Sequence, residues 1–146
     1  MIAFLDLTAL AALFAGGPGR VQVLEAIRSE ASLAVAMISK VSMAVLLDDL
    51  LREGVPAETV TSIGRSFLEQ GTDFVKVPTD VVIMEAMLLS VRHHLKTDPA
   101  VQLASALHLE RQVLRQAGFL DRPVVLVTLD PDMAAAAQRE GLRTAP

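Results

Sequence analysis

The chain has 146 residues, with 13 Lys and Arg against 17 Asp and Glu, which gives a net charge of −4. Hydrophobic residues make up 52% of it, which excludes a disordered chain. The absence of Cys excludes disulfide bonds and Cys-ligated zinc or iron–sulfur sites. The acidic balance argues against broad electrostatic binding to nucleic acid, and the lack of Trp and Tyr argues against a base-stacking platform.

The length suits one domain over residues 1–146. The longest stretch without a charge, Leu7–Gly19, is shorter than the ~18 apolar residues of a membrane-spanning helix. Asp6 precedes this stretch, where a signal peptide would carry basic residues. We therefore expect a cytoplasmic protein that does not associate with a membrane.

Short apolar runs alternate with stretches of helical periodicity along the chain. Strands are expected at Ile2–Leu5, Ser32–Val35, Phe74–Val77, Val124–Val127 and Leu142–Thr144. Helices are expected directly after Asp6 and over Arg20–Ser29, Lys40–Arg52, Pro56–Gln70, Asp80–His94, Asp98–Gln116 and Met133–Arg139. Continuous β-branched runs of this length are typical of strands covered on both faces. The alternation predicts an α/β fold, a three-layer α/β/α sandwich with a mostly parallel sheet.

Local signals support several of these helices. Asp98 and Asp130 each precede a proline, which is the pattern of a helix cap followed by Pro at the first helical position. The stretch Gly16–Gly19 lacks the Lys-Ser/Thr of a nucleotide-binding loop, so we interpret it as a turn between the first two helices. One later helix carries an apolar stripe, formed by Val81, Met84, Leu88 and Val91.

Two acidic residues fall where predicted strands end. Asp6 directly follows the first strand, and Asp130 comes shortly after Val124–Val127. Ligands bind at the carboxyl ends of the strands in parallel sheets, so this edge is the candidate functional site. Asp6 also needs a partner, because an unpaired buried carboxylate is costly.

Three motifs, in this order, resemble those of the PIN-domain family, especially the toxin subunits of VapBC-type toxin–antitoxin pairs. Residues 4–10 read FLDLTAL, residues 101–107 read VQLASAL, and residues 127–130 read VTLD before an Ala-rich stretch. The resemblance implies a PIN-like fold, a homodimer and an antitoxin-like protein partner. It also implies hydrolysis of RNA that depends on Mg²⁺ or Mn²⁺ held by about four acidic residues.

By this resemblance Asp6 is the first acid of the metal site and Asp130 the last, while Thr128 hydrogen-bonds beside them. Divalent cations such as Mg²⁺ prefer carboxylate oxygens, and a metal-activated water would attack the phosphodiester. Ser42 and Pro99 replace the family's two other acids.

Two acids near the altered positions are candidates to complete the site as metal ligands. Asp98 lies one residue before Pro99, and Asp132 lies two residues after Asp130. Adjacent positions on a helix are rotated by about 100°, so Asp98 is not an automatic substitute for an acid at position 99. Asp98 and Asp130 also have a structural alternative as helix caps.

Two functional hypotheses follow. In the first, the acidic site is incomplete, catalysis is weak or lost, and the protein is retained for dimerisation and partner binding. In the second, Asp6, Asp130 and Asp98 hold Mg²⁺ or Mn²⁺ in an active endoribonuclease. The replaced acids favour the first. The three histidines, His93, His94 and His108, are expected to be ordinary surface or interface residues.

Overall fold

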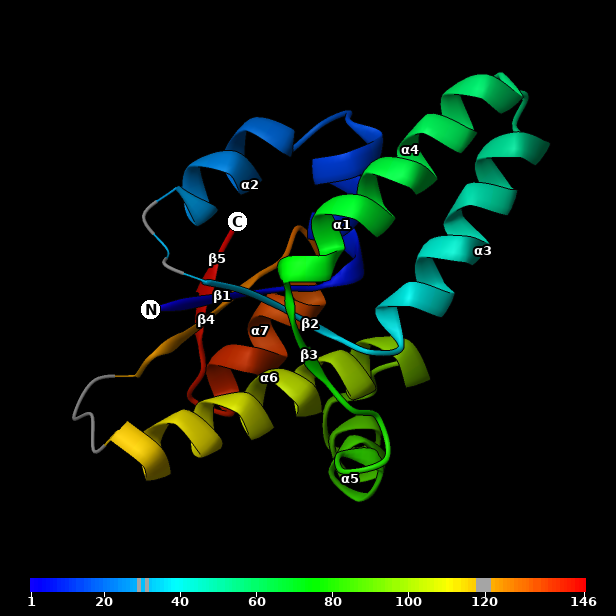
Figure 1. Cartoon of the computed structure of the whole chain (residues 1–146). Helices are drawn as coiled ribbons and strands as arrows, with labels where there is room; N and C mark the ends of the chain where they lie inside the picture. The colour runs from blue at the N-terminus through cyan, green and yellow to red at the C-terminus, as the bar shows by residue number, and fades with distance from the viewer. Residues whose placement is uncertain (29, 31, 118–121) are drawn as a thin grey trace.

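A parallel sheet occupies the centre of the computed structural model, which describes residues 1–28, 30, 32–117 and 122–146 (Figure 1). Within these ranges the strands are β1 (Ile2–Leu5), β2 (Ser32–Ala36), β3 (Val75–Val77), β4 (Val124–Val127) and β5 (Arg143–Ala145). They run in the order β3-β2-β1-β4-β5, and every neighbouring pair is parallel. The predicted mostly parallel sheet is thus confirmed.

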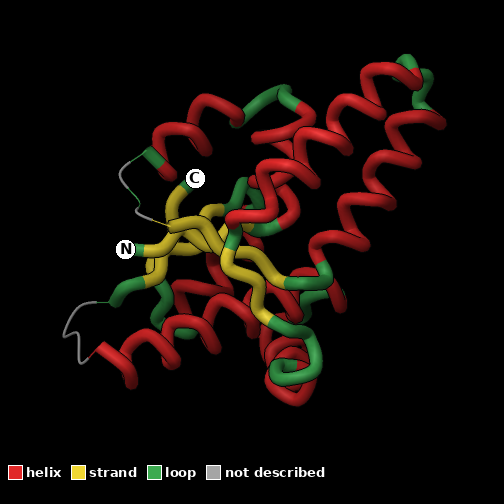
Figure 2. The backbone as a smooth tube through the Cα atoms, in the orientation of Figure 1, coloured by secondary structure: helices red, strands yellow, loops and turns green. Residues whose placement is uncertain are grey.

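The helices cover both faces of this sheet (Figure 2). They are α1 (Leu7–Ala15), α2 (Arg20–Ile27), α3 (Ser39–Arg52), α4 (Ala57–Gln70), α5 (Ile83–His93), α6 (Thr97–Ala117) and α7 (Pro131–Arg139), with a 3₁₀ turn η1 (Gly71–Asp73). The predicted three-layer sandwich is therefore confirmed. Its predicted second helix was expected to end at Ser29, which lies outside the described residues.

Alternate side chains of each strand enter two separate cores. In β1, Phe4 packs with α5, α6 and α7, whereas Ala3 and Leu5 pack with α1 to α4 on the opposite face. This alternation follows from the two-residue period of a strand. Because both faces are buried, β1 and β4 are apolar throughout, and their bounds agree with the prediction.

Helix α6 begins earlier than its Asp-Pro sequence predicts. Ala100 N donates to Lys96 O at 3.0 Å, so Asp98 lies in the first turn instead of capping the helix from outside. Pro99 is tolerated there because the first N–H groups of a helix have no partner within the helix.

The stripe predicted on the helix after Asp80 lies on the surface. Met84 is 73% exposed and Val91 78% exposed, while Val82, Ala86 and Leu89 form the buried side of this segment. The helix is apolar on both sides, so periodicity alone could not show which side faces the core. No single helix in the described ranges is long and apolar enough to cross a membrane.

Both edge strands of the sheet are only three residues long. In β3 the ammonium of Lys76 donates to the carbonyl oxygens of Thr72 at 3.0 Å and Phe74 at 3.2 Å. Pro78 follows β3 and Pro146 follows β5, and a proline has no N–H to offer a neighbouring strand.

Candidate functional site

Asp6 lies at the carboxyl end of β1 and caps helix α1. It is 2% exposed, and its Oδ1 accepts hydrogen bonds from Ala9 N at 2.9 Å and Thr8 Oγ1 at 2.7 Å. The hydroxyl of Thr128 donates to Oδ2. Both oxygens of the carboxylate are therefore already engaged by protein donors.

Two threonine hydroxyls connect Asp6 to the backbone that follows β4. Thr8 Oγ1 accepts from Leu129 N at 2.8 Å, and Thr128 Oγ1 accepts from Asp130 N at 3.0 Å. Each hydroxyl thus donates to Asp6 and accepts from the β4–α7 turn. The sequence predicted Thr128 as a hydrogen-bonding neighbour of the acids but gave no role to Thr8.

Asp130 caps helix α7 from the end of β4. Its Oδ1 accepts from Asp132 N at 2.9 Å and from Met133 N at 3.3 Å, and Pro131 occupies the first helical position. The cap predicted from the Asp-Pro pattern is confirmed. Asp132 lies in the first turn of α7, where an acidic side chain is favoured by the helix dipole.

Burial raises the pKa of Asp6 above its ordinary value of 3.8. The hydrogen bonds from Thr128, Ala9 and Thr8 act in the opposite direction, and the negative charge of Asp130 adds to the increase. The pKa of Asp6 is raised although three donors stabilise its charged form.

The remaining candidate acid, Asp98, is held by a different partner. The hydroxyl of Ser42 on α3 donates to Asp98 Oδ2, which links α3 to α6. Gln102, one turn further along α6, accepts from Leu7 N at 2.7 Å through its Oε1. The role of this glutamine was not predicted, although Gln102 and Ser105 are the polar residues within the mainly apolar Val101–Leu107.

Asp130 and Asp132 face a cavity at this edge of the sheet, between α7 and the connection from α5 to α6. It is lined by His93, His94, Leu95, Lys96, Pro99, Asp130, Asp132, Ala135, Ala136 and Arg139. Pro99, where the resemblance implies an acid, lines the same cavity as Asp130 and Asp132.

His93 departs from the expected surface role. Its side chain is 4% exposed, and Nε2 lies 2.6 Å from Glu140 Oε1, which also accepts from Arg92 at 2.7 Å. These two partners lower the pKa of Glu140 against the effect of burial, which alone would raise it. His93 is buried because α5 ends against the end of α7, and His94 remains exposed.

The donors at this edge do not form a complete site for the Mg²⁺ or Mn²⁺ that the resemblance implies. Among the residues that the structure describes, no three Asp, Glu or His side chains are grouped so that they could hold one ion. Asp6 and Asp130 are linked through the Thr128 hydroxyl, which donates to Asp6 and accepts from Asp130 N, whereas Asp98 accepts from Ser42. Mg²⁺ requires several oxygen ligands at about 2.0–2.1 Å, so the residues present do not fit it.

The sequence matches no protein-family model and no curated protein sequence. Three solved structures, in contrast, resemble the fold. PAE2754 from Pyrobaculum aerophilum, a PIN-domain protein, has a TM-score of 0.59 at 18% identity, covering 99% of this chain and 83% of its own.

The other two structures give similar values. A toxin–antitoxin complex from Klebsiella pneumoniae has a TM-score of 0.60 at 16% identity, covering 91% of this chain and 90% of its own. FitAcB from Neisseria gonorrhoeae has a TM-score of 0.61 at 13% identity, covering 99% and 96%. The chain therefore has the three-layer fold of these PIN-like structures, as its motifs predict.

Proposed function

We propose that this protein is a PIN-like binding protein of the toxin–antitoxin type, with an incomplete acidic metal site and weak or no nuclease activity. The observation that carries this proposal is the state of the candidate acids. Both oxygens of Asp6 accept hydrogen bonds from the protein, and Asp98 is paired with Ser42. A metal ion would have to displace these donors, and it would gain few carboxylates in return.

The partners in this proposal are an antitoxin-like protein and a second copy of the chain. The toxin–antitoxin complex among the similar structures supports the first. The exposed stripe of α5 supports the second, because it lies beside a cavity between α5 and α6 with no charged residue in its lining. Val91 belongs to both the stripe and the cavity lining, and the exposed Met87 extends this apolar surface along the cavity, so one patch offers both a ridge and a groove. A two-fold interface needs such a self-complementary patch.

Metal titration calorimetry tests the proposed state of the acidic site. We expect no Mg²⁺ or Mn²⁺ binding at millimolar concentration for the unaltered chain, and measurable binding for Ser42→Glu combined with Pro99→Asp. The uncharged pair Ser42→Gln with Pro99→Asn is the matched control and should not bind. Binding by the unaltered chain that disappears in Asp6→Asn, together with Mg²⁺-dependent RNA cleavage, would instead establish the active nuclease.

The molar mass in solution tests the proposed dimer. We expect light scattering at micromolar concentration to give twice the chain mass, and Leu88→Glu to give the monomer, since a charge would be buried at the interface. Val21→Glu places the same charge at another exposed apolar residue, on α2, and should leave the dimer intact. A monomeric unaltered chain would exclude the homodimer.

A further inference from the structure

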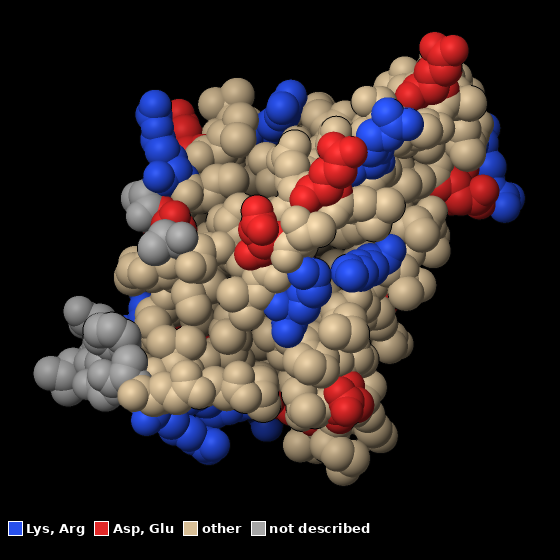
Figure 3. All heavy atoms as spheres, in the orientation of Figure 1, with Lys and Arg blue, Asp and Glu red and all other residues tan. Residues whose placement is uncertain are grey.

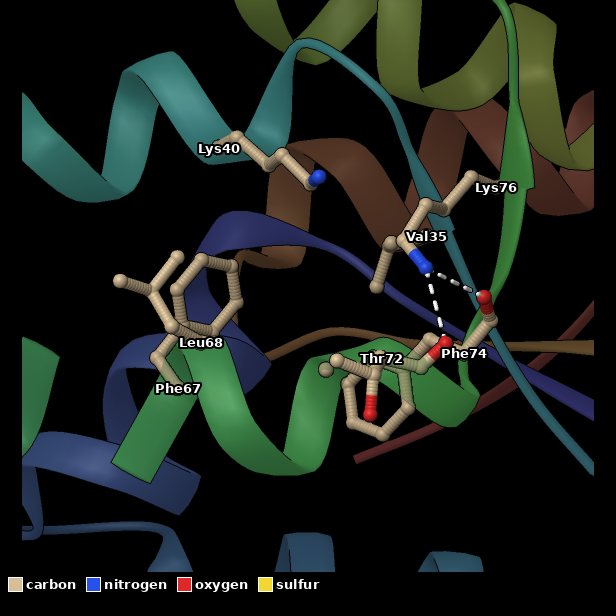
Figure 4. A pocket seen from close by; sticks show the side chains of 8 residues that line it. Val35, Lys40, Phe67, Leu68, Thr72, Phe74 and Lys76 are labelled. Atoms are coloured by element: carbon tan, nitrogen blue, oxygen red, sulfur yellow. Dashed lines mark hydrogen bonds between the residues drawn. The ribbon is translucent and has the colours of Figure 1, made fainter. Parts of the chain in front are cut away.

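The chain contains only three lysines, and two of them line one pocket (Figure 4). Lys40 comes from the first turn of α3 and Lys76 from β3, so the fold brings them together from distant positions. No acidic residue lines this pocket, whose other walls are Val35, Phe67, Leu68, Gly71, Thr72 and Phe74. It lies on the sheet face covered by α1 to α4, opposite to α5.

The interior of the pocket is apolar and rests on an aromatic cluster. Phe67 and Phe74 are buried, and Phe14 packs edge-on against Phe67 with ring centroids 5.4 Å apart. Leu68 at the rim is 64% exposed. The cavity of about 70 Å³ is far smaller than a typical small-molecule site of about 300–1,000 Å³, and its size suits a single side chain.

Neither ammonium group has a charged partner among the residues that the structure describes. Lys76 uses two of its three protons on the uncharged carbonyl oxygens of Thr72 and Phe74, which fixes its position. Lys40 forms no hydrogen bond or ion pair within the described ranges, and Figure 4 shows its side chain extending from α3 on the pocket side. On the face in Figure 3, acidic and basic side chains are interspersed, and several of opposite sign lie next to one another. Two lysines without a charged partner in the described part of the chain, beside one apolar pocket, would suit an anionic ligand with an apolar part.

We propose that this pocket binds an acidic segment of a partner protein. One aliphatic side chain of that segment enters between Phe67, Phe74 and Leu68, and flanking carboxylates pair with Lys40 and Lys76. The inference deepens the proposed binding function by naming the chemistry of the partner, and it depends on neither the metal site nor the α5 interface. RNA fits less well, because the aromatic rings here are buried and offer no surface for base stacking.

A lysine-resolved titration tests the proposal directly. Protein labelled with ¹³C-lysine gives three Cε signals by nuclear magnetic resonance, one each for Lys40, Lys76 and Lys96. The probe is the blocked peptide acetyl-Gly-Asp-Leu-Glu-Gly-amide at millimolar concentration. We expect it to shift the Lys40 and Lys76 signals and to leave that of Lys96, which lies at the carboxyl edge of the sheet, unchanged.

Two matched peptides separate the charged and apolar contributions. The neutral peptide acetyl-Gly-Asn-Leu-Gln-Gly-amide should bind about fivefold more weakly, as for the loss of exposed ion pairs. The peptide acetyl-Gly-Asp-Gly-Glu-Gly-amide, without the leucine, should bind about tenfold more weakly. Equal affinities for all three peptides would overturn the proposal, as would the absence of shifts at Lys40 and Lys76.

Variants identify the residues that carry the binding. Lys40→Met and Leu68→Ala change exposed side chains, so both should fold and each should weaken binding by about fivefold. Lys96→Met is the control and should bind normally. Stronger binding by a uridine decanucleotide than by the acidic peptide would reassign the pocket to RNA.

The dimer-disrupting Leu88→Glu variant separates this inference from the proposed function. Peptide binding that persists in this monomer shows that the pocket acts independently of α5. If the unaltered chain does not dimerise but binds the peptide, only the dimer is excluded. If it dimerises but does not bind the peptide, only the pocket is excluded. Peptide binding that requires the dimer would contradict the pocket as described.

Discussion

Asp6 and Asp130 end two neighbouring parallel strands, yet their surroundings differ. Both carboxylates cap the helix that follows, α1 in one case and α7 in the other. Asp6 is buried and receives three hydrogen bonds, two of them from threonine hydroxyls. Asp130 is partly exposed, lines a cavity and receives bonds only from the backbone of its own helix.

A carboxylate at a strand end can serve as the cap of the helix that follows, as both acids do. Capping accounts for the position of both acids, and the hydroxyl network accounts for the burial of Asp6. Asp130 retains an oxygen for which the structure shows no protein donor, so of the two it is the more available to a ligand. We therefore expect Asp6 to contribute mainly to stability.

The largest expected effect is the loss of the Asp6 carboxylate. Asp6→Ala removes a helix cap and leaves buried donors on Thr8, Ala9 and Thr128 without an acceptor, which should lower the free energy of unfolding by about 3 kcal/mol. Asp130→Ala removes only a cap and should lower it by about 1 kcal/mol. Urea denaturation followed by circular dichroism measures both free energies of unfolding. Equal decreases in the two variants would contradict the proposed difference between Asp6 and Asp130.

A smaller effect is expected for Thr128, which connects the two acids. Thr128→Val keeps the shape of the side chain but removes the hydroxyl, so Oδ2 of Asp6 loses its donor and the N–H of Asp130 loses its acceptor. The free energy of unfolding should fall by about 1–2 kcal/mol. Thr128→Ser retains the hydroxyl and should recover most of that loss, whereas a serine variant as unstable as the valine variant would argue for packing alone.

The smallest effect is a dependence on pH that should distinguish Asp6 from the other acids. Because its pKa is raised on folding, the folded chain holds more protons than the unfolded chain between pH 3.8 and the folded pKa. The free energy of unfolding therefore decreases as the pH rises through this window. Asp6→Asn removes this contribution and leaves that of Glu140 unchanged.

Denaturation of the unaltered chain and of Asp6→Asn at several pH values between pH 3.5 and pH 7.5 provides the test. The stability of the unaltered chain relative to the variant should be greatest at the acidic end and should then decline to a constant. A relative stability that increases with pH would show that hydrogen bonding outweighs burial at Asp6.

Much of the fold was predictable because an uninterrupted apolar run in the sequence indicates a strand that is buried on both faces. The run Val124–Val127 is apolar throughout since both faces of β4 are covered, and its bounds were predicted correctly. The surface of α5 was not predictable in the same way. Met84 and Leu88 are as apolar as the buried Leu89, so only the packing of α5 against α6 decides which side is exposed.

The candidate site was predictable in part. The ends of the apolar strands located Asp6 and Asp130, and the Asp-Pro pattern identified the cap on α7. The pairing of Asp98 with Ser42 depends on how α3 packs against α6. The spacing of residues along the sequence does not predict that packing. Lys40 and Lys76 likewise come to line one pocket only in the folded protein, although the sequence itself shows that the chain has few lysines.

The edges of the sheet influence how this protein can associate with others. An edge strand with free N–H and C=O groups can template another strand, which is the usual route to aggregation and domain swapping. Here both edge strands are short and each is followed by proline. In addition, the Lys76 ammonium donates a hydrogen bond to the carbonyl oxygen of Phe74. Extension of the sheet from one molecule into the next is disfavoured. Under the proposed function, recognition would therefore use side chains of the helical layers, so that a complex could form and dissociate while each sheet stays intact.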